Sequence, residues 1–94
     1  MTEMDKLEKW LKENAPRFGW TYTREDKGTL PYDQHQICVY SDGIIQWDVI
    51  CHYGSYGYRQ GLLEIYGNLV DGGVKGWLTA EDIIRRIEKK EWNE

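Results

Sequence analysis

The chain has 94 residues, of which 40% are hydrophobic and 14% aromatic, including five Trp and seven Tyr. This length predicts a single domain over residues 1–94, and the aromatic content excludes a disordered chain. The formal net charge of −4 comes from 16 acidic and 12 basic residues. General binding to nucleic-acid backbones is therefore not expected, because it needs a basic surface.

No targeting or membrane segment is recognisable in the sequence. The start of the chain is charged throughout, and no stretch approaches the roughly 18–20 apolar residues that a membrane span needs. Cys38 and Cys51 do not form a C-x-x-C pair, so zinc-finger spacing is absent. We therefore expect a cytoplasmic protein whose two cysteines are reduced and mostly buried.

The first elements are predicted to be a helix and a short strand. Thr2 to Asn14 has apolar residues at helical spacing, and Thr2 with Asp5 is close to the capping-box pattern. Trp20 to Arg24 then alternates large and small side chains, which predicts a strand.

The clearest local signal is a hairpin between Gln34 and Tyr53, with Asp42-Gly43 at its turn. Asp-Gly between apolar runs favours a type I′ turn, which places Cys38 opposite Trp47 and sorts the side chains onto two faces. The predicted core face holds Cys38, Tyr40, Ile45, Trp47, Val49, Cys51 and Tyr53. The other face is mixed and holds His35, Ile37, Val39, Ile44, Gln46, Asp48, Ile50 and His52.

The remaining pattern predicts one more strand and a final helix. Leu62 to Tyr66 is the strand, and the glycine-rich stretch Asn68 to Gly76 is expected to be a loop. The last helix begins after a Thr79 cap and runs to about Lys90 or Trp92. The order α-β-β-β-β-α predicts an α+β fold, in which two helices cover one face of a four-stranded antiparallel sheet.

The least ordinary stretch is the glycine-tyrosine loop from His52 to Gly61. Its glycines permit sharp turns, and its tyrosines offer flat apolar faces with polar tips, as protein interfaces and base-stacking sites do. A loop whose tyrosines fold back onto the core is an equally open alternative. The residues predicted to bind a partner or ligand are His52, Tyr53, Tyr56, Tyr58 and Arg59.

A second group of candidates lies on the mixed face. His35 and Asp48 are secondary binding candidates, and the hairpin register places Asp33 opposite His52. Two imidazoles and two carboxylates would suit a transition metal or acid–base work, although a solvated sheet face is the more common arrangement. Cys51 and His52 are strand neighbours that point to opposite faces, so we do not expect a nucleophile–base pair. No catalytic residue, metal ligand or cofactor is assigned.

Three sequence strings carry a resemblance to known proteins. Residues 47–58 (WDVICHYGSYGY), 60–64 (QGLLE) and 76–84 (GWLTAEDII) resemble a group of small uncharacterised proteins of phages, prophages and other mobile elements of Gram-positive bacteria. The resemblance extends from the first helix to the last and implies no catalytic residues. It implies a context in which small proteins often bind and inhibit a host component, anti-CRISPR and other anti-defence proteins being one such class.

Together these observations favour a non-enzymatic protein that binds and inhibits or modulates a host protein. One alternative is a binder of a small molecule or nucleotide signal, with Tyr56 or Tyr58 stacking on a base and Arg59 on a phosphate. A second alternative is a small metal-dependent enzyme that uses His35, Asp48 and His52. Exposed sheet edges leave a homo-oligomer open.

Overall fold

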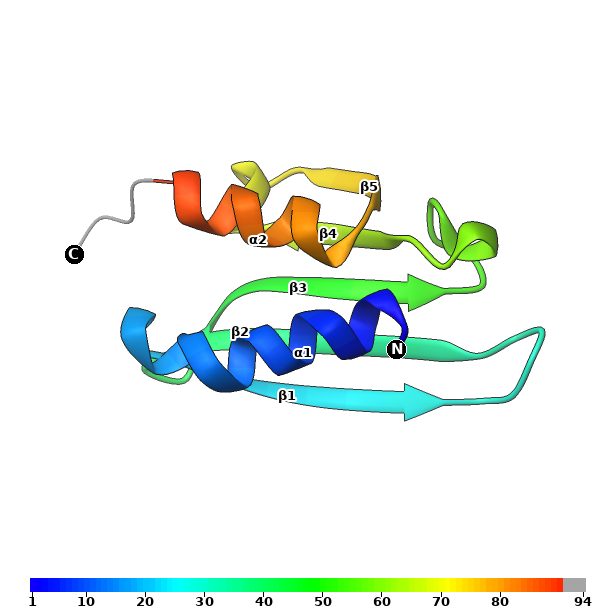
Figure 1. Cartoon of the computed structure of the whole chain (residues 1–94), viewed down its shortest axis with the longest axis horizontal. Coiled ribbons are helices and arrows are strands. Elements are labelled where there is room, and N and C mark those ends of the chain that lie inside the picture. The colour runs from blue at the N-terminus through cyan, green and yellow to red at the C-terminus, as the bar shows by residue number, and fades with distance from the viewer. Residues whose placement is uncertain (91–94) are drawn as a thin grey trace.

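In the computed structural model, two helices lie on one face of an antiparallel sheet whose strands differ in length (Figure 1). The structure describes residues 1–90. The sheet has five strands in the order β1-β2-β3-β4-β5, so each strand pairs with its neighbours in sequence. Neither helix in these residues is long and apolar enough to cross a membrane. The elements are α1 (Glu3–Asn14), β1 (Trp20–Lys27), β2 (Gln34–Ser41), β3 (Ile44–His52), β4 (Leu63–Gly67), β5 (Val74–Leu78) and α2 (Ala80–Lys89), with short 3-10 turns at Ala15–Phe18, Tyr58–Gln60 and Asn68–Val70.

The α+β class is confirmed, but the sheet has one strand more than expected. The added strand, β5, occupies part of the stretch Asn68 to Gly76 that was predicted to be a loop. It lacks a clean alternation because Gly76 interrupts it and Trp77 has a left-handed backbone, with φ of 61°. Its pairing with β4 is also irregular, which explains why no strand pattern was visible in the sequence.

Both helices begin with the capping box that the sequence predicts. The Thr2 hydroxyl accepts from the Asp5 backbone N–H at 3.0 Å, and the Asp5 carboxylate accepts from the Thr2 N–H at 3.2 Å. Thr79 and Asp82 repeat this reciprocal pair at the start of α2. The helix α2 ends at Lys89, and the alternative predicted end at Trp92 lies outside the described residues.

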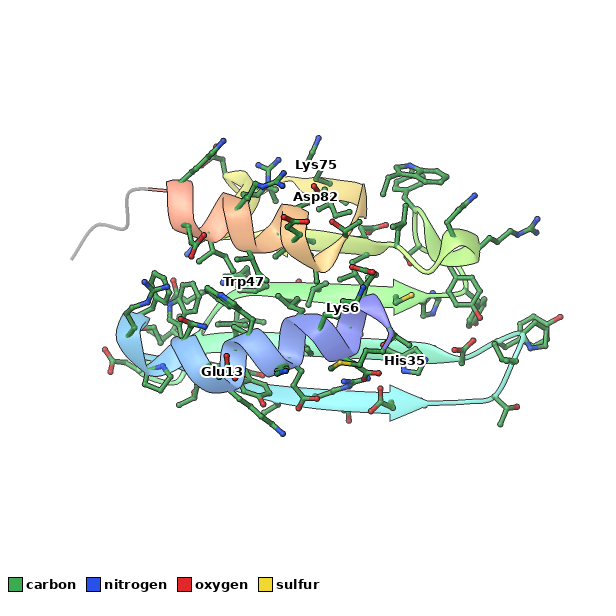
Figure 2. All side chains as sticks on the ribbon, viewed as in Figure 1. Lys6, Glu13, His35, Trp47, Lys75 and Asp82 are labelled. Atoms are coloured by element: carbon green, nitrogen blue, oxygen red, sulfur yellow. The ribbon has the colours of Figure 1, made fainter. Side chains whose placement is uncertain are left out.

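The core fills the space between the helices and the covered sheet face. Trp47 is its largest fully buried side chain and lies beneath the helices (Figure 2). The Trp47 Nε1–H has no acceptor among the described residues, which costs on the order of 1–3 kcal/mol that the packing of this ring must offset. The other buried residues are Met4, Leu7, Leu11, Ala15, Trp20, Ile37, Val39, Val49, Leu63, Ile65, Leu69, Leu78, Ala80, Ile83 and Ile87.

The hairpin turn lies where the sequence predicts it, but a bulge follows it. Asp42 and Gly43 have φ of 52° and 77°, as a type I′ turn requires, and Tyr40 pairs with Ile45. The register then shifts between Val39 and Tyr40, so that Val39, not Cys38, faces Trp47. One residue of β3, Gln46, is therefore extra, which is the definition of a β-bulge.

The predicted faces are wrong for β2 and right for β3 only beyond the bulge, because Ile45 and Tyr53, both predicted on the core face, are 52% and 47% exposed. Trp47 and Val49 are buried, as expected. On β2, however, Ile37 and Val39 are buried on the helix-covered face, while Cys38 and Tyr40 lie on the uncovered face. A one-residue slip moves side chains to the opposite face, which explains why the two sets of β2 residues are exchanged.

Gly67 on β4 accommodates the bulge, and its replacement should be costly. Its φ is 114°, and a Cβ atom there would lie 2.7 Å from the Gln46 carbonyl oxygen. Gly67→Ala should lower the free energy of unfolding by about 3 kcal/mol, from backbone strain plus this clash. Urea denaturation measures the loss.

Gly72→Ala is the matched control for that prediction. Gly72 also has a positive φ, of 83°, but a Cβ atom there would meet nothing within 4 Å. It should therefore lose only about 1 kcal/mol, the cost of the left-handed backbone. Equal losses in the two variants would show that the close contact with Gln46 is absent.

Candidate functional site

Four exposed aromatic side chains gather at one end of the molecule, which we call the aromatic end: Tyr32, Tyr53, Tyr56 and Trp77. The rings of Tyr32 and Tyr53 meet edge to face, with centroids 5.5 Å apart. Tyr53, Tyr56 and Trp77 border one shallow depression of about 230 Å³. Their exposed fractions of 47% to 67% show that Tyr53 and Tyr56 do not fold back onto the core. Three separate segments of the chain thus bring these rings together.

Two glycines allow this assembly. A Cβ atom at Gly76 would lie 2.4 Å from the Cβ of Tyr56, and one at Gly57 would lie 3.2 Å from the Cα of Trp77. Because neither glycine has a side chain, the loop can lie directly against β5, where the Trp77 N–H donates to the Tyr56 carbonyl at 3.5 Å. The glycines of the loop therefore place aromatic rings rather than cradle a phosphate.

Trp77 combines backbone strain with exposure. Its φ of 61° is rare for a bulky residue and costs on the order of 1–2 kcal/mol. Its ring is 57% exposed, so burial of the indole does not compensate for this cost. Strain of this kind is typical of residues kept for a function rather than for stability.

A cavity of about 550 Å³ adjoins the aromatic end, between the N-terminal end of α1 and the sheet. Tyr58 and Arg59 of the predicted site line it, as does the secondary candidate His35. The Tyr58 hydroxyl donates to Asp33. The full lining is Thr2, Met4, Asp5, Arg24, Asp26, Leu30, Asp33, His35, Cys51, Tyr58, Arg59 and Gly61.

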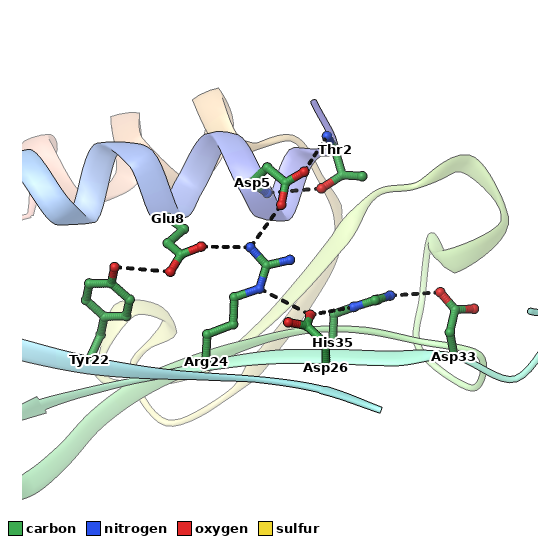
Figure 3. A network of polar contacts seen from close by, with 8 residues as sticks. All are labelled: Thr2, Asp5, Glu8, Tyr22, Arg24, Asp26, Asp33 and His35. Atoms are coloured by element: carbon green, nitrogen blue, oxygen red, sulfur yellow. Dashed lines mark hydrogen bonds and ion pairs between the residues drawn. The ribbon is translucent and has the colours of Figure 1, made fainter. Parts of the chain in front are cut away.

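Arg24 is the centre of a charged network beside this cavity (Figure 3). Its Nη1 donates to Asp5 Oδ1 at 3.0 Å and to Glu8 Oε1 at 2.9 Å, and its Nε donates to Asp26 Oδ1 at 3.2 Å. Since Asp5 and Glu8 belong to α1, one guanidinium joins the first helix to the end of β1. The three carboxylates raise the pKa of Arg24 against the opposing effect of its burial.

His35 continues the network between two carboxylates (Figure 3). Its Nδ1 lies 2.6 Å from Asp26 Oδ1 and its Nε2 lies 2.8 Å from Asp33 Oδ2. Both ring nitrogens can donate only in the imidazolium, and the bond to Asp26 is the main cause that raises the pKa of His35. The hydrogen bond from Tyr58 and then that from His35 lower the pKa of Asp33, while Asp33 raises the pKa of Tyr58 to about 12.

The proposed metal or acid–base group is not assembled. Asp48 lies on the uncovered face, where it accepts from Gln36 Nε2 at 2.8 Å and where burial raises its pKa. His35 lies on the opposite face, toward α1. The three candidates His35, Asp48 and His52 therefore do not converge, and residues 1–90 contain no group of three His, Cys, Asp or Glu side chains placed to hold a metal.

His52 instead shapes the start of the loop. Its Nδ1 accepts from the Gly54 N–H at 2.8 Å, and its ring stacks on Tyr53 with centroids 4.2 Å apart. The expected pairing with Asp33 is wrong, because Gln34 is the strand partner of His52. His52 thus holds the start of the loop and stacks on Tyr53.

Reasoning from the sequence missed the charged half of the cavity. The predicted strand ended at Arg24, whereas β1 continues through Asp26 to Lys27, and Asp33 precedes β2. One signal was present: Tyr22, Arg24 and Asp26 follow Trp20 at intervals of two, which places them on the covered face of the sheet.

Comparisons with protein-family models, curated proteins and solved structures find no significant match to this chain.

The pH dependence of stability should report the bridge made by His35. Because the pKa of His35 is raised in the folded chain, the stabilisation is complete below the unfolded pKa of about 6.5 and is lost as pH rises through the folded value. The free energy of unfolding should fall by on the order of 1 kcal/mol or less between about pH 6 and pH 8. In His35→Gln this fall should be absent, as measured by urea denaturation.

His52→Gln serves as the control in that experiment. It leaves the contacts of His35 with Asp26 and Asp33 intact, so its stability should keep the wild-type slope. A slope in His35→Gln equal to that of the wild type would contradict a charged His35 between two carboxylates.

The two cysteines are free and lie on opposite faces of the sheet, both only partly buried. Cys51 lines the cavity, and Cys38 lies on the uncovered face. Burial raises the pKa of both thiols, which lowers the thiolate fraction.

Both cysteines should react with iodoacetamide several-fold more slowly in the native chain than in urea, as followed by mass spectrometry at about pH 8. Native rates equal to those in urea would refute this effect of burial.

Proposed function

We propose that this protein works by binding another protein through the aromatic end, without catalysis. The observation that carries the proposal is the gathering of Tyr32, Tyr53, Tyr56 and Trp77, all about half exposed or more, from three separate segments. Tyrosine and tryptophan are enriched among the residues that dominate binding energy at protein interfaces. An exposed aromatic patch on a chain this small is a typical docking surface.

The side chains of the aromatic end also indicate what the partner surface should offer. Arg59 borders the same depression and makes no ion pair within residues 1–90. An apolar groove that accepts Tyr56 and Trp77, flanked by a carboxylate for Arg59, would match both features. The strain at Trp77 fits this role, because a ring held ready in the free protein loses little conformational freedom on binding.

The resemblance to small proteins of phages and mobile elements extends this proposal to a cellular role. The partner is then a host protein, and binding inhibits or modulates it, anti-CRISPR and other anti-defence proteins being one class. Support for this step comes from the sequence strings alone, whereas the aromatic end supports the mode of binding.

A double variant of the aromatic end tests the proposal. Tyr56→Ser combined with Trp77→Asn removes two exposed rings, and asparagine tolerates the positive φ at position 77. If each ring contributes about 2 kcal/mol, affinity for the partner should fall roughly a thousandfold. The measurement is recovery of a stoichiometric host protein on the tagged full chain, followed by titration of that purified partner.

The opposite end of the sheet offers a matched control. Ile44 and Ile45 are 66% and 52% exposed beside the Asp42-Gly43 turn, at the other end of β3 (Figure 1). Ile44→Ser with Ile45→Ser removes a similar apolar area and should leave recovery and affinity unchanged. Failure of the wild type to retain any stoichiometric partner, or equal weakening by the two double variants, would defeat the proposal.

A further inference from the structure

We infer that the cavity beside the aromatic end binds a small organic anion, a carboxylate or phosphate carried on an apolar body. This inference goes beyond the proposed protein binding and does not depend on it. It rests on the shape of the cavity and on the hydrogen-bonding capacity that its charged network leaves unused.

The size and walls of the cavity suit a small organic molecule. Its volume of about 550 Å³ falls inside the range of roughly 300–1,000 Å³ that is typical of ligand pockets. Met4 from α1, Leu30 from the β1–β2 connection and Cys51 from β3 supply apolar wall. An inorganic ion would leave these walls in contact with water, so the ligand needs an apolar body.

The network leaves cationic donors unused. Arg24 engages Asp5, Glu8 and Asp26 through Nη1 and Nε, but its Nη2 makes no hydrogen bond within residues 1–90. Figure 3 shows Nη2 directed away from Glu8, toward the side of the network where His35 lies. Arg59, which also lines the cavity, likewise makes no hydrogen bond or ion pair within these residues. Two arginines from different elements thus line one space.

The carboxylates, in contrast, are mostly occupied. Both oxygens of Asp5 accept, from Thr2 and Arg24, and both oxygens of Asp33 accept, from Tyr58 and His35. Asp26 uses one oxygen twice, for Arg24 and His35. Asp26 Oδ2 is the one carboxylate oxygen of the lining without a hydrogen bond in residues 1–90, whereas Arg24 Nη2 and the Arg59 guanidinium are cationic donors without one.

The charges along the wall also permit an anion. Each carboxylate of the lining (Asp5, Asp26, Asp33) pairs with Arg24 or His35, and Arg59 adds a cation without an ion pair in residues 1–90; Glu8, which also pairs with Arg24, lies outside the lining. Hydrogen bonds on three sides hold Arg24 in place before any ligand arrives, which lowers the entropic cost of binding to it.

A matched set of probes tests the inference on the full chain. The probes are 4-phenylbutyrate, phenyl phosphate, 4-phenylbutylamine and 4-phenylbutanol, titrated to millimolar concentration by ¹H–¹⁵N NMR. One or both anions should shift the signals of Cys51 and Gly61, and the amine and alcohol should bind more weakly. The anion that binds more tightly then shows whether the cavity prefers a carboxylate or a phosphate.

Alkylation of the two cysteines provides a second readout of where the anion binds. A bound anion should slow alkylation of Cys51, which lines the cavity, and leave Cys38 unaffected, because it lies on the opposite sheet face. Arg59→Gln should weaken binding of the anion roughly tenfold through loss of a charge-assisted contact. Arg85→Gln, an exposed arginine on α2, is the control and should not change it.

Several results would overturn the inference. The inference fails if the amine or the alcohol binds as tightly as the anions, or if neither anion shifts the NMR signals. It also fails if the anion protects both cysteines equally from alkylation, or if Arg59→Gln does not weaken anion binding. Trp77→Asn should leave the affinity for the anion unchanged, so that failure of the cavity and failure of the aromatic end are told apart.

Discussion

The bulge at Gln46 is the constraint on which the rest of this structure depends. It shifts the β2–β3 register by one residue, so that Ile37 and Val39 join Trp47 and Val49 beneath the helices. The same shift places His35 on the covered face, directly opposite Cys51. Without the extra residue, β2 would present Cys38 and Gln36 to the helices, and His35 would face away from Arg24 and α1.

Two kinds of surface meet at the end of the sheet where β3 finishes. The charged network joins α1 to β1 and β2 at the wall of the cavity, and the loop after β3 carries the aromatic rings. Tyr58 and Arg59 border both spaces. A ligand in the cavity and a protein on the aromatic end would therefore contact the same short 3-10 turn, so that the two proposed activities adjoin although they rest on different observations.

Local signals in the sequence were enough to predict the helices, the hairpin turn and the class of fold. The capping boxes at Thr2 and Thr79 and the Asp42-Gly43 turn are short-range patterns, and each has the predicted geometry. The bulge was not predictable, because it depends on close approach between Gln46 and Gly67, which are far apart in sequence. The cavity was missed for the same reason: His35, Arg24 and Asp33 meet only once the register is known. The aromatic loop was recognisable from its composition, but two rings of the aromatic end, Tyr32 and Trp77, come from other segments, and Trp77 belongs to a strand that the sequence did not reveal.

The register of β2 on β3 can be measured directly in solution by backbone and side-chain NOEs across the hairpin. We expect NOEs that link Val39 with Trp47, Ile37 with Val49 and His35 with Cys51. A network of NOEs that instead links Cys38 with Trp47 and Gln36 with Val49 would mean that the bulge is absent. The covered face, the position of His35 and the wall of the cavity would then all be contradicted.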